Sequence, residues 1–110
     1  KLIRDTFDMA AIHGSAIPTV PLKDSIRKIS DVNTNESVAL NRSDFISVQT
    51  PQCFDLALLK PSFAVSYSPT FTDDASVFEA AGHKIKICAG DPINLKVTTP
   101  EDLLIAKALA

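Results

Sequence analysis

The sequence has few glycines, few cysteines and no long apolar run. Its three glycines, Gly14, Gly82 and Gly90, lie far apart, so these residues contain no glycine-rich phosphate loop. The two cysteines, Cys53 and Cys88, lie in apolar strings without the spacing of a secreted disulfide scaffold, and we expect two buried free thiols. No apolar stretch approaches the roughly 20 residues of a membrane span, so we expect neither a membrane segment nor a signal peptide.

Two further absences limit the chemistry. A net charge of -2 does not provide the basic surface that nucleic-acid binding requires, and we expect no nucleic-acid partner. No His, Cys, Asp or Glu cluster has metal-ligand spacing, and no Ser-His-Asp or Cys-His arrangement stands out. His13 and His83 both lie beside glycines at expected ends of elements, which is typical of surface residues. We therefore expect this chain not to be a complete enzyme by itself.

The composition that remains is that of an ordinary folded domain, with 45% hydrophobic and 22% charged residues among 110. Apolar periodicity and capping residues predict helices, and short β-branched runs between turns predict strands. The expected helices are residues 1–13, 54–60 (interrupted by Pro61), 73–81 and 100–109, the last two capped by Thr72 and Thr99. The expected strands are 16–22, 26–30, 38–40, 45–48, 83–89 and 95–98. Alternation of the two types predicts an α/β fold.

Residues 23–49 are predicted to form a β arm with a polar tip. The arm has few large apolar residues, and a two-stranded ribbon alone is marginal in water. We therefore expect the arm to pack against a second subunit. The chain also opens at Lys1 directly in a helical pattern, with no methionine or capping residue before it, so we expect a piece of something longer. The first helix should present an apolar face, led by Leu2, Ile3 and Phe7, without a partner in this chain.

Four polar residues are candidates for binding or catalysis. Arg42 lies in a polar loop and could grip a phosphate with both guanidinium edges. Thr72 precedes a helix start, where an anion or hydroxyl could bind. Lys96 alternates with apolar neighbours in an expected strand and could point into a cleft, and Ser25 follows two charged residues in a turn. Residue types alone favour a solvated or capping residue in each case, and the functional interpretation stays open as the alternative.

Four longer segments resemble one known family in its order and spacing. They are VPLKDSIRK (residues 20–28), VQTPQCFD (48–55), FTDDASVFEAAGHKIKICAG (71–90) and INLKVTTPEDLLIAKAL (93–109). Together they cover nearly the whole chain, and they resemble the 2-C-methyl-D-erythritol 4-phosphate cytidylyltransferases of non-mevalonate isoprenoid biosynthesis. The ribitol 5-phosphate cytidylyltransferases look similar over the same segments, so a second polyol phosphate remains an alternative substrate.

The resemblance implies a fold and an activity. The fold is part of a single three-layer, Rossmann-like domain of the nucleotide-diphospho-sugar-transferase type, with a β arm that clasps a second subunit in a homodimer. The activity is transfer of CMP from CTP to the polyol phosphate, with release of pyrophosphate and a requirement for Mg²⁺. The family's CTP-binding half precedes the matched region, so we expect residues 1–110 to be the C-terminal portion, and the ligands of Mg²⁺ to lie elsewhere. The expected compartment is the bacterial cytoplasm or a plastid.

The resemblance also assigns roles to the four candidates. Ser25 matches an arm threonine that contacts substrate bound to the other subunit, and Arg42 matches the arm arginine that grips its phosphate. Thr72 matches a substrate-binding threonine, and Lys96 matches a catalytic lysine that stabilises charge on the reacting phosphates. The competing hypothesis is a non-catalytic dimerisation module, since the expected CTP-binding half is absent from this sequence.

Overall fold

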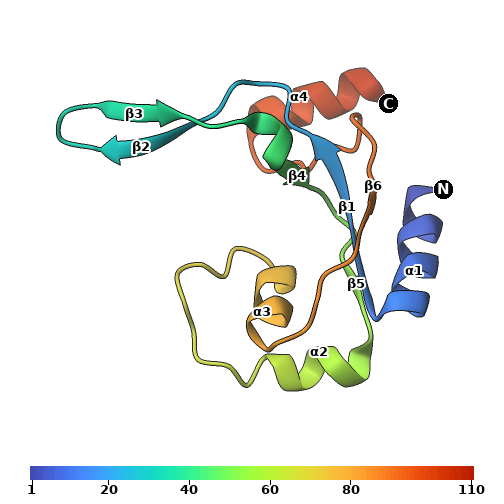
Figure 1. Ribbon diagram of the computed structural model, residues 1–110. Coiled ribbons are helices and arrows are strands. Elements are labelled where there is room, and N and C mark those ends of the chain that lie inside the picture. Colours follow the sequence, from blue (N-terminus) through green and yellow to red (C-terminus); the bar gives the residue numbers. More distant parts are fainter.

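Helices and strands alternate along the chain, which confirms the expected α/β class. The computed structural model describes all residues from 1 to 110 (Figure 1). The elements are α1 (Leu2–His13), β1 (Ser15–Pro21), β2 (Arg27–Asp31), β3 (Glu36–Ala39), the 3-10 helix η1 (Arg42–Asp44), β4 (Ile46–Val48), β5 (Cys53–Phe54), α2 (Leu56–Ser62), α3 (Asp74–Ala80), β6 (Ile87–Ala89) and α4 (Pro100–Leu109). None of these helices is long and apolar enough to cross a membrane.

Strand β1 is the centre of a four-stranded mixed sheet. Strand β6 runs parallel to it, whereas β4 and β5 both run antiparallel. The register shows an insertion between β4 and β5. Thr19 pairs with Val48 of β4, and Ala16 pairs with Cys53 of β5. The step between these pairs is three residues along β1 but five residues along the segment from β4 to β5. Two extra residues therefore bulge out of this edge, within segment 49–52, as expected where a strand changes direction.

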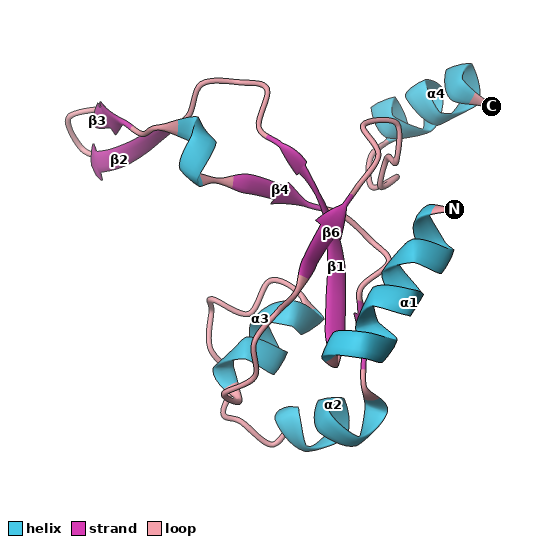
Figure 2. Ribbon diagram, turned by 45° about the vertical axis from the view of Figure 1, so that its right-hand side comes forward, coloured by secondary structure: helices cyan, strands magenta, loops and turns pink.

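Helices cover both faces of this sheet, and Figure 2 shows α1 and α3 on opposite sides of β1. On one face, α1 buries Thr6 and Ala10. On the other, Phe78 of α3 is 1% exposed and packs against Phe54 of β5, with ring centroids 5.0 Å apart. The layers therefore follow the three-layer arrangement that was expected.

The two cysteines lie beside β1 on the face that α1 covers. Cys88 of β6 faces Pro18 and lies 3.6 Å from Oγ1 of Thr6, and Cys53 of β5 faces Ala16. Both are free thiols, as expected, but they are half-buried and not buried. Burial, followed by the neighbouring Cys88 thiol, raises the pKa of Cys53 above its ordinary value.

Large apolar side chains on the outer helix faces have no partner within the chain. On α1, Ile3 is 71% exposed and Phe7 is 63% exposed, which confirms the expected unpartnered face at these two residues, while Leu2 is half-buried. No residue of α4 is buried, and Leu104 is 67% exposed.

The arm has narrower bounds than 23–49. Strands β2 and β3 form a separate two-stranded sheet, held also by Arg27, whose Nε donates to Oγ of Ser37 across 2.7 Å. Figure 1 shows this hairpin extending away from the remainder of the chain. The third expected strand, β4, pairs with β1 instead and belongs to the main sheet. The apolar residues of β4 lie beside β1 in the main sheet, whereas the polar hairpin has few apolar residues for them to contact.

Three further expectations were wrong in detail. The helix after 54 starts at Leu56, because Asp55 caps it, and it continues past Pro61 to Ser62. A proline removes only one intrahelical bond there, and Oγ of Ser62 donates to the carbonyl of Leu58 across 2.8 Å. The strand expected at 83–89 covers only β6, and residues 95–98 form no strand at all, because no other segment forms a hydrogen-bond ladder with them.

Candidate functional site

A cleft of about 710 Å³ opens where three distant segments meet. Two of the four predicted site residues, Thr72 and Lys96, line it together. The cleft residues are Ser47, Val48, Gln49, Thr50, Pro51, Gln52, Thr72, Asp73, Asp74, Asn94, Leu95 and Lys96. The floor is the bulged segment between β4 and β5, one wall is the start of α3, and the other wall is the loop after β6.

The α3 wall is organised by Asp73, not by Thr72 as the sequence predicted. Asp73 is the N-cap: its Oδ1 accepts from the backbone N–H of Ser76 across 2.8 Å, and Ser76 closes a capping box in return. Thr72 lies one residue earlier and leaves its own side chain exposed at the cleft. A threonine released from capping is free to contact a ligand.

Hydrogen bonds keep the cap carboxylate ionised. Partial burial would raise the pKa of Asp73, but hydrogen bonds from the side chains of Ser76 and Gln52, and from the backbone of Ser76, lower it below the ordinary value. The bond from Gln52 runs from Nε2 to Oδ2 of Asp73 across 2.9 Å. This carboxylate is therefore fully engaged in holding the helix start.

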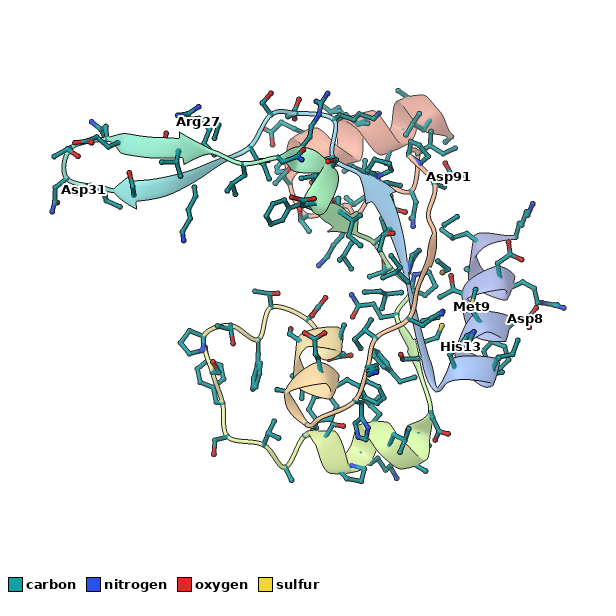
Figure 3. All side chains as sticks on the ribbon, viewed as in Figure 1. Asp8, Met9, His13, Arg27, Asp31 and Asp91 are labelled. Atoms are coloured by element: carbon teal, nitrogen blue, oxygen red, sulfur yellow. The ribbon has the colours of Figure 1, made fainter.

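The opposite wall carries Lys96, the only basic residue that lines the cleft. It is exposed and lies in an extended loop, not in a strand. The turn that begins this loop, at Asp91, is labelled in Figure 3. The ammonium group of Lys96 gives the cleft one positive charge, and Thr72 adds a hydroxyl to the same lining, which suits an anionic ligand with polar neighbours.

Arg42 and Ser25 do not reach this cleft within one chain. Arg42 begins η1 at the base of the arm, where its guanidinium donates a hydrogen bond to the carbonyl of Lys23. It lines a smaller hollow with Thr19 and Phe45. Ser25 is exposed in the connection between β1 and β2. Thr72 and Lys96 therefore share the cleft, whereas Arg42 and Ser25 lie outside it on the segments that flank the arm.

Metal-binding groups do not gather in the cleft. No set of three His, Cys, Asp or Glu residues comes together anywhere in the chain, and Asp73 already serves the helix start. The residues present thus do not fit a Mg²⁺ site of their own. Their chemistry is that of hydroxyl, amide and ammonium groups placed around an anion.

Sequence reasoning missed the three amide residues of the cleft: Gln49, Gln52 and Asn94. The segment VQTPQCFD was used only as part of the resemblance. A usable signal was present, since two amides stand on either side of Thr50-Pro51 between two apolar strand segments. Polar residues at a break between strands are typical of a bulge that turns side chains toward a site.

Comparison with known proteins covers nearly the whole chain. The family model described as 2-C-methyl-D-erythritol 4-phosphate cytidylyltransferase matches residues 2–110. A protein of that name from Bacteroides thetaiotaomicron is 38% identical over 109 residues, which make up 99% of this chain and 48% of the relative. Another from Bacillus cereus is 41% identical over 110 residues, with 98% of this chain and 48% of the relative covered.

Solved structures show the same likeness in three dimensions. The crystal structure of the 2-C-methyl-D-erythritol 4-phosphate cytidylyltransferase from Thermus thermophilus superposes with a TM-score of 0.81 at 29% identity, covering 98% of this chain and 53% of that one. The chain spans about half the length of the curated relatives it matches.

Proposed function

This chain belongs to the 2-C-methyl-D-erythritol 4-phosphate cytidylyltransferase family, and from that membership we propose that it forms the acceptor side of such an enzyme. The reaction is transfer of CMP from CTP to 2-C-methyl-D-erythritol 4-phosphate, with release of pyrophosphate. The observation that carries the proposal is the cleft that Thr72 and Lys96 both line. A hydroxyl and a cation on opposite walls suit a phosphorylated polyol that meets a second phosphate.

In the proposed reaction, an oxygen of the polyol phosphate attacks the α-phosphorus of CTP. A new P–O bond forms there, and the bond to the bridging oxygen of pyrophosphate breaks. Negative charge grows on the oxygens around the α-phosphorus, and the ammonium group of Lys96 stabilises it. Thr72 binds the polyol phosphate through its exposed hydroxyl. Each role uses the side chain's own charge or donor.

Arg42 and Ser25 act in this proposal from the arm of a second copy of the chain. Within one chain they lie at the base of the arm, apart from the cleft. A homodimer in which the arm reaches the partner would place the guanidinium of Arg42 on the polyol phosphate and the hydroxyl of Ser25 beside it. The polar, isolated hairpin supports this arrangement, because a two-stranded sheet is marginal without a neighbour.

CTP and Mg²⁺ are assigned to residues outside this chain. The only glycines are Gly14, Gly82 and Gly90, so no glycine-rich phosphate loop is present. The carboxylates of the cleft do not make a metal site. We place the reaction in the cytoplasm of a bacterium or in a plastid, supported by the bacterial sources of the relatives.

The test is an assay of pyrophosphate release by this chain expressed within its complete reading frame. With CTP present, we expect release that depends on 2-C-methyl-D-erythritol 4-phosphate and exceeds the rate with ribitol 5-phosphate. Faster release with ribitol 5-phosphate would transfer the assignment to that substrate. No release with either, from a protein that is folded and dimeric, would favour a non-catalytic dimerisation module.

A further inference from the structure

The bulge between β4 and β5 sends two glutamine side chains to opposite walls of the cleft. Gln49 and Gln52 are the only glutamines in the sequence, and both are half-buried. Each uses both atoms of its amide group on backbone or side-chain atoms of a neighbouring wall. One short segment therefore touches both the loop that carries Lys96 and the helix start that carries Thr72.

Gln49 holds the loop after β6. Its Nε2 donates to the carbonyl of Asp91 across 2.8 Å and to that of Asn94 across 3.4 Å. Its Oε1 accepts from the backbone N–H of Asp91 across 3.0 Å. Asn94 adds a bond from Nδ2 to the carbonyl of Thr50 across 2.7 Å. The turn that leads to Lys96 is thus bound to the bulge at several points.

This hold matters because Lys96 has no other regular support. Its loop lies outside every helix and strand, so no backbone ladder fixes the position of the ammonium group. The loop also approaches closely at Gly90, where a Cβ would lie 2.4 Å from Oε1 of Gln49 and 2.8 Å from the carbonyl oxygen of Thr19. The residue at 90 therefore has to be glycine for the amide of Gln49 to fit.

Gln52 holds the start of α3. Its Nε2 donates to Oδ2 of Asp73 across 2.9 Å, and its Oε1 accepts from the backbone N–H of Ala75 across 3.2 Å. These bonds join the cap carboxylate and the first turn to the bulge. Thr72 directly precedes this cap, so its place at the cleft depends on where the helix start is held.

We propose that Gln49 and Gln52 are positioning residues for the reaction: Gln49 sets the place of Lys96, and Gln52 sets the place of Thr72. The inference rests on the proposed function and adds residues to it. Because the two amides serve different walls, they affect different kinetic constants. Loss of Gln49 misplaces a charge needed in the transition state, whereas loss of Gln52 misplaces a group that binds substrate.

The expected kinetics separate the two roles. Gln49→Ala lowers kcat by up to about 100-fold, the scale of a misplacement of about 1 Å. Gln52→Ala raises KM for the polyol phosphate about threefold to tenfold, as loss of one or two hydrogen bonds would. Glu79→Ala is the matched control, because it removes a side chain of the same length from an exposed position of α3 outside the cleft.

The decisive measurement is a pair of double-mutant cycles in the protein expressed from its complete reading frame. If Gln49 acts through Lys96, Gln49→Ala has no further effect on kcat once Lys96→Ala is present. Likewise, Gln52→Ala has no further effect on KM in a Thr72→Ala background. Effects that multiply independently in both cycles, or a fall in melting temperature with unchanged kinetic constants, overturn the inference.

Replacement variants and a check of wild-type activity keep the test interpretable. Where an alanine variant does not fold, Gln49→Met and Gln52→Met keep the side-chain length and remove the hydrogen-bonding atoms, and the same cycles apply. A folded wild-type protein without cytidylyltransferase activity overturns the proposed function and this inference together. An active wild type with independent cycles overturns the inference alone.

Discussion

Thr72 and Lys96 line the same cleft although neither belongs to a helix or a strand. Thr72 lies just before the cap of α3, and Lys96 lies in the extended loop that follows β6. Regular structure brings the two loops to the same place, but side-chain amides and a helix cap set the final distance between them. The geometry of this cleft therefore depends on polar contacts that contribute little to the core.

Lys96→Ala should lower kcat by about 10²–10³-fold, the usual cost of removing a preorganised charge-stabilising group. In the proposed reaction, negative charge develops around the α-phosphorus beside this ammonium group. Steady-state kinetics on the protein expressed from its complete reading frame provides the measurement. Lys84→Ala, at an exposed position outside the cleft, is the control and should keep its kcat. A wild-type kcat in Lys96→Ala would remove this residue from the site.

Arg42→Ala should raise KM for the polyol phosphate and spare KM for CTP, because the guanidinium is proposed to bind substrate in the ground state and the transition state alike. Arg27→Ala is the matched control, since it removes a positive charge from the same arm at a residue whose side chain bonds only to Ser37. Unchanged KM values for both substrates in Arg42→Ala would contradict the assignment.

Mixing the Arg42→Ala and Lys96→Ala proteins should restore part of the activity. If the site is shared between subunits, a mixed dimer contains one site with an intact Arg42 beside an intact Lys96. Activity is measured after subunit exchange, which is followed independently with differently tagged subunits. Complete exchange without any recovery would show that Arg42 does not act across the dimer.

Asp73 should stabilise the fold in a pH-dependent way. Its folded-state pKa is lowered, so the ionised carboxylate contributes stability above its unfolded pKa of about 3.9, and that contribution is lost as the pH falls through the folded-state value. Asp73→Asn keeps an acceptor for the cap but cannot ionise. Urea unfolding should show a difference between wild type and Asp73→Asn that is constant from pH 7 to about pH 5 and shrinks as the pH falls below about 4.

Two comparisons make this result specific. Asp73→Ala removes the cap as well and should cost about 0.5–2 kcal/mol at pH 7. Asp74→Asn changes the neighbouring exposed carboxylate, which has no side-chain bond to Gln52. A difference between wild type and Asp73→Asn that stays constant from pH 3 to pH 7 would contradict the role of ionisation.

The 110-residue chain alone should show no sharp, cooperative unfolding transition above about 65 °C. Only 10 of its residues are buried, and apolar side chains such as Ile3 and Phe7 face outward. Each large apolar side chain left exposed forgoes about 1.5–3 kcal/mol of burial. Calorimetry measures the unfolding transition. Phe7→Lys replaces one of the exposed apolar side chains and should improve solubility without lowering stability. A sharp transition above that temperature would contradict the prediction.

The sequence predicted those elements whose signals are local. The helix at 2–13 ends at Gly14, which has a φ of 87°, and Thr99 with Pro100 begins α4, as their capping patterns indicated. The hairpin of β2 and β3 also follows from its own turn residues. Of the candidate site, the resemblance provided Thr72 and Lys96, and the cleft contains both.

Features that depend on distant partners could not be read from the sequence. Residues 95–98 alternate like a strand, but alternation creates no strand without a neighbour to pair with. Asp73 is the cap of α3 through a local capping box with Ser76, but the bond from Gln52 to its other carboxylate oxygen comes from a distant segment. The bulge between β4 and β5 appears only when both strands are laid against β1. The sequence shows two amides flanking Thr50-Pro51, but the walls that Gln49 and Gln52 bond to appear only in three dimensions.

The central place of β1 also orders the events of synthesis on the ribosome. Its partners end at residues 48, 54 and 89, so the last edge of the sheet can close only when Ala89 has emerged. At about 5–20 residues per second, synthesis reaches the end of β6 several seconds after β1 has emerged. The hairpin of β2 and β3 closes within about 1–10 μs of appearing. During that interval the nascent chain carries a finished arm on an open sheet edge, and this is the stage at which a chaperone would have most to protect.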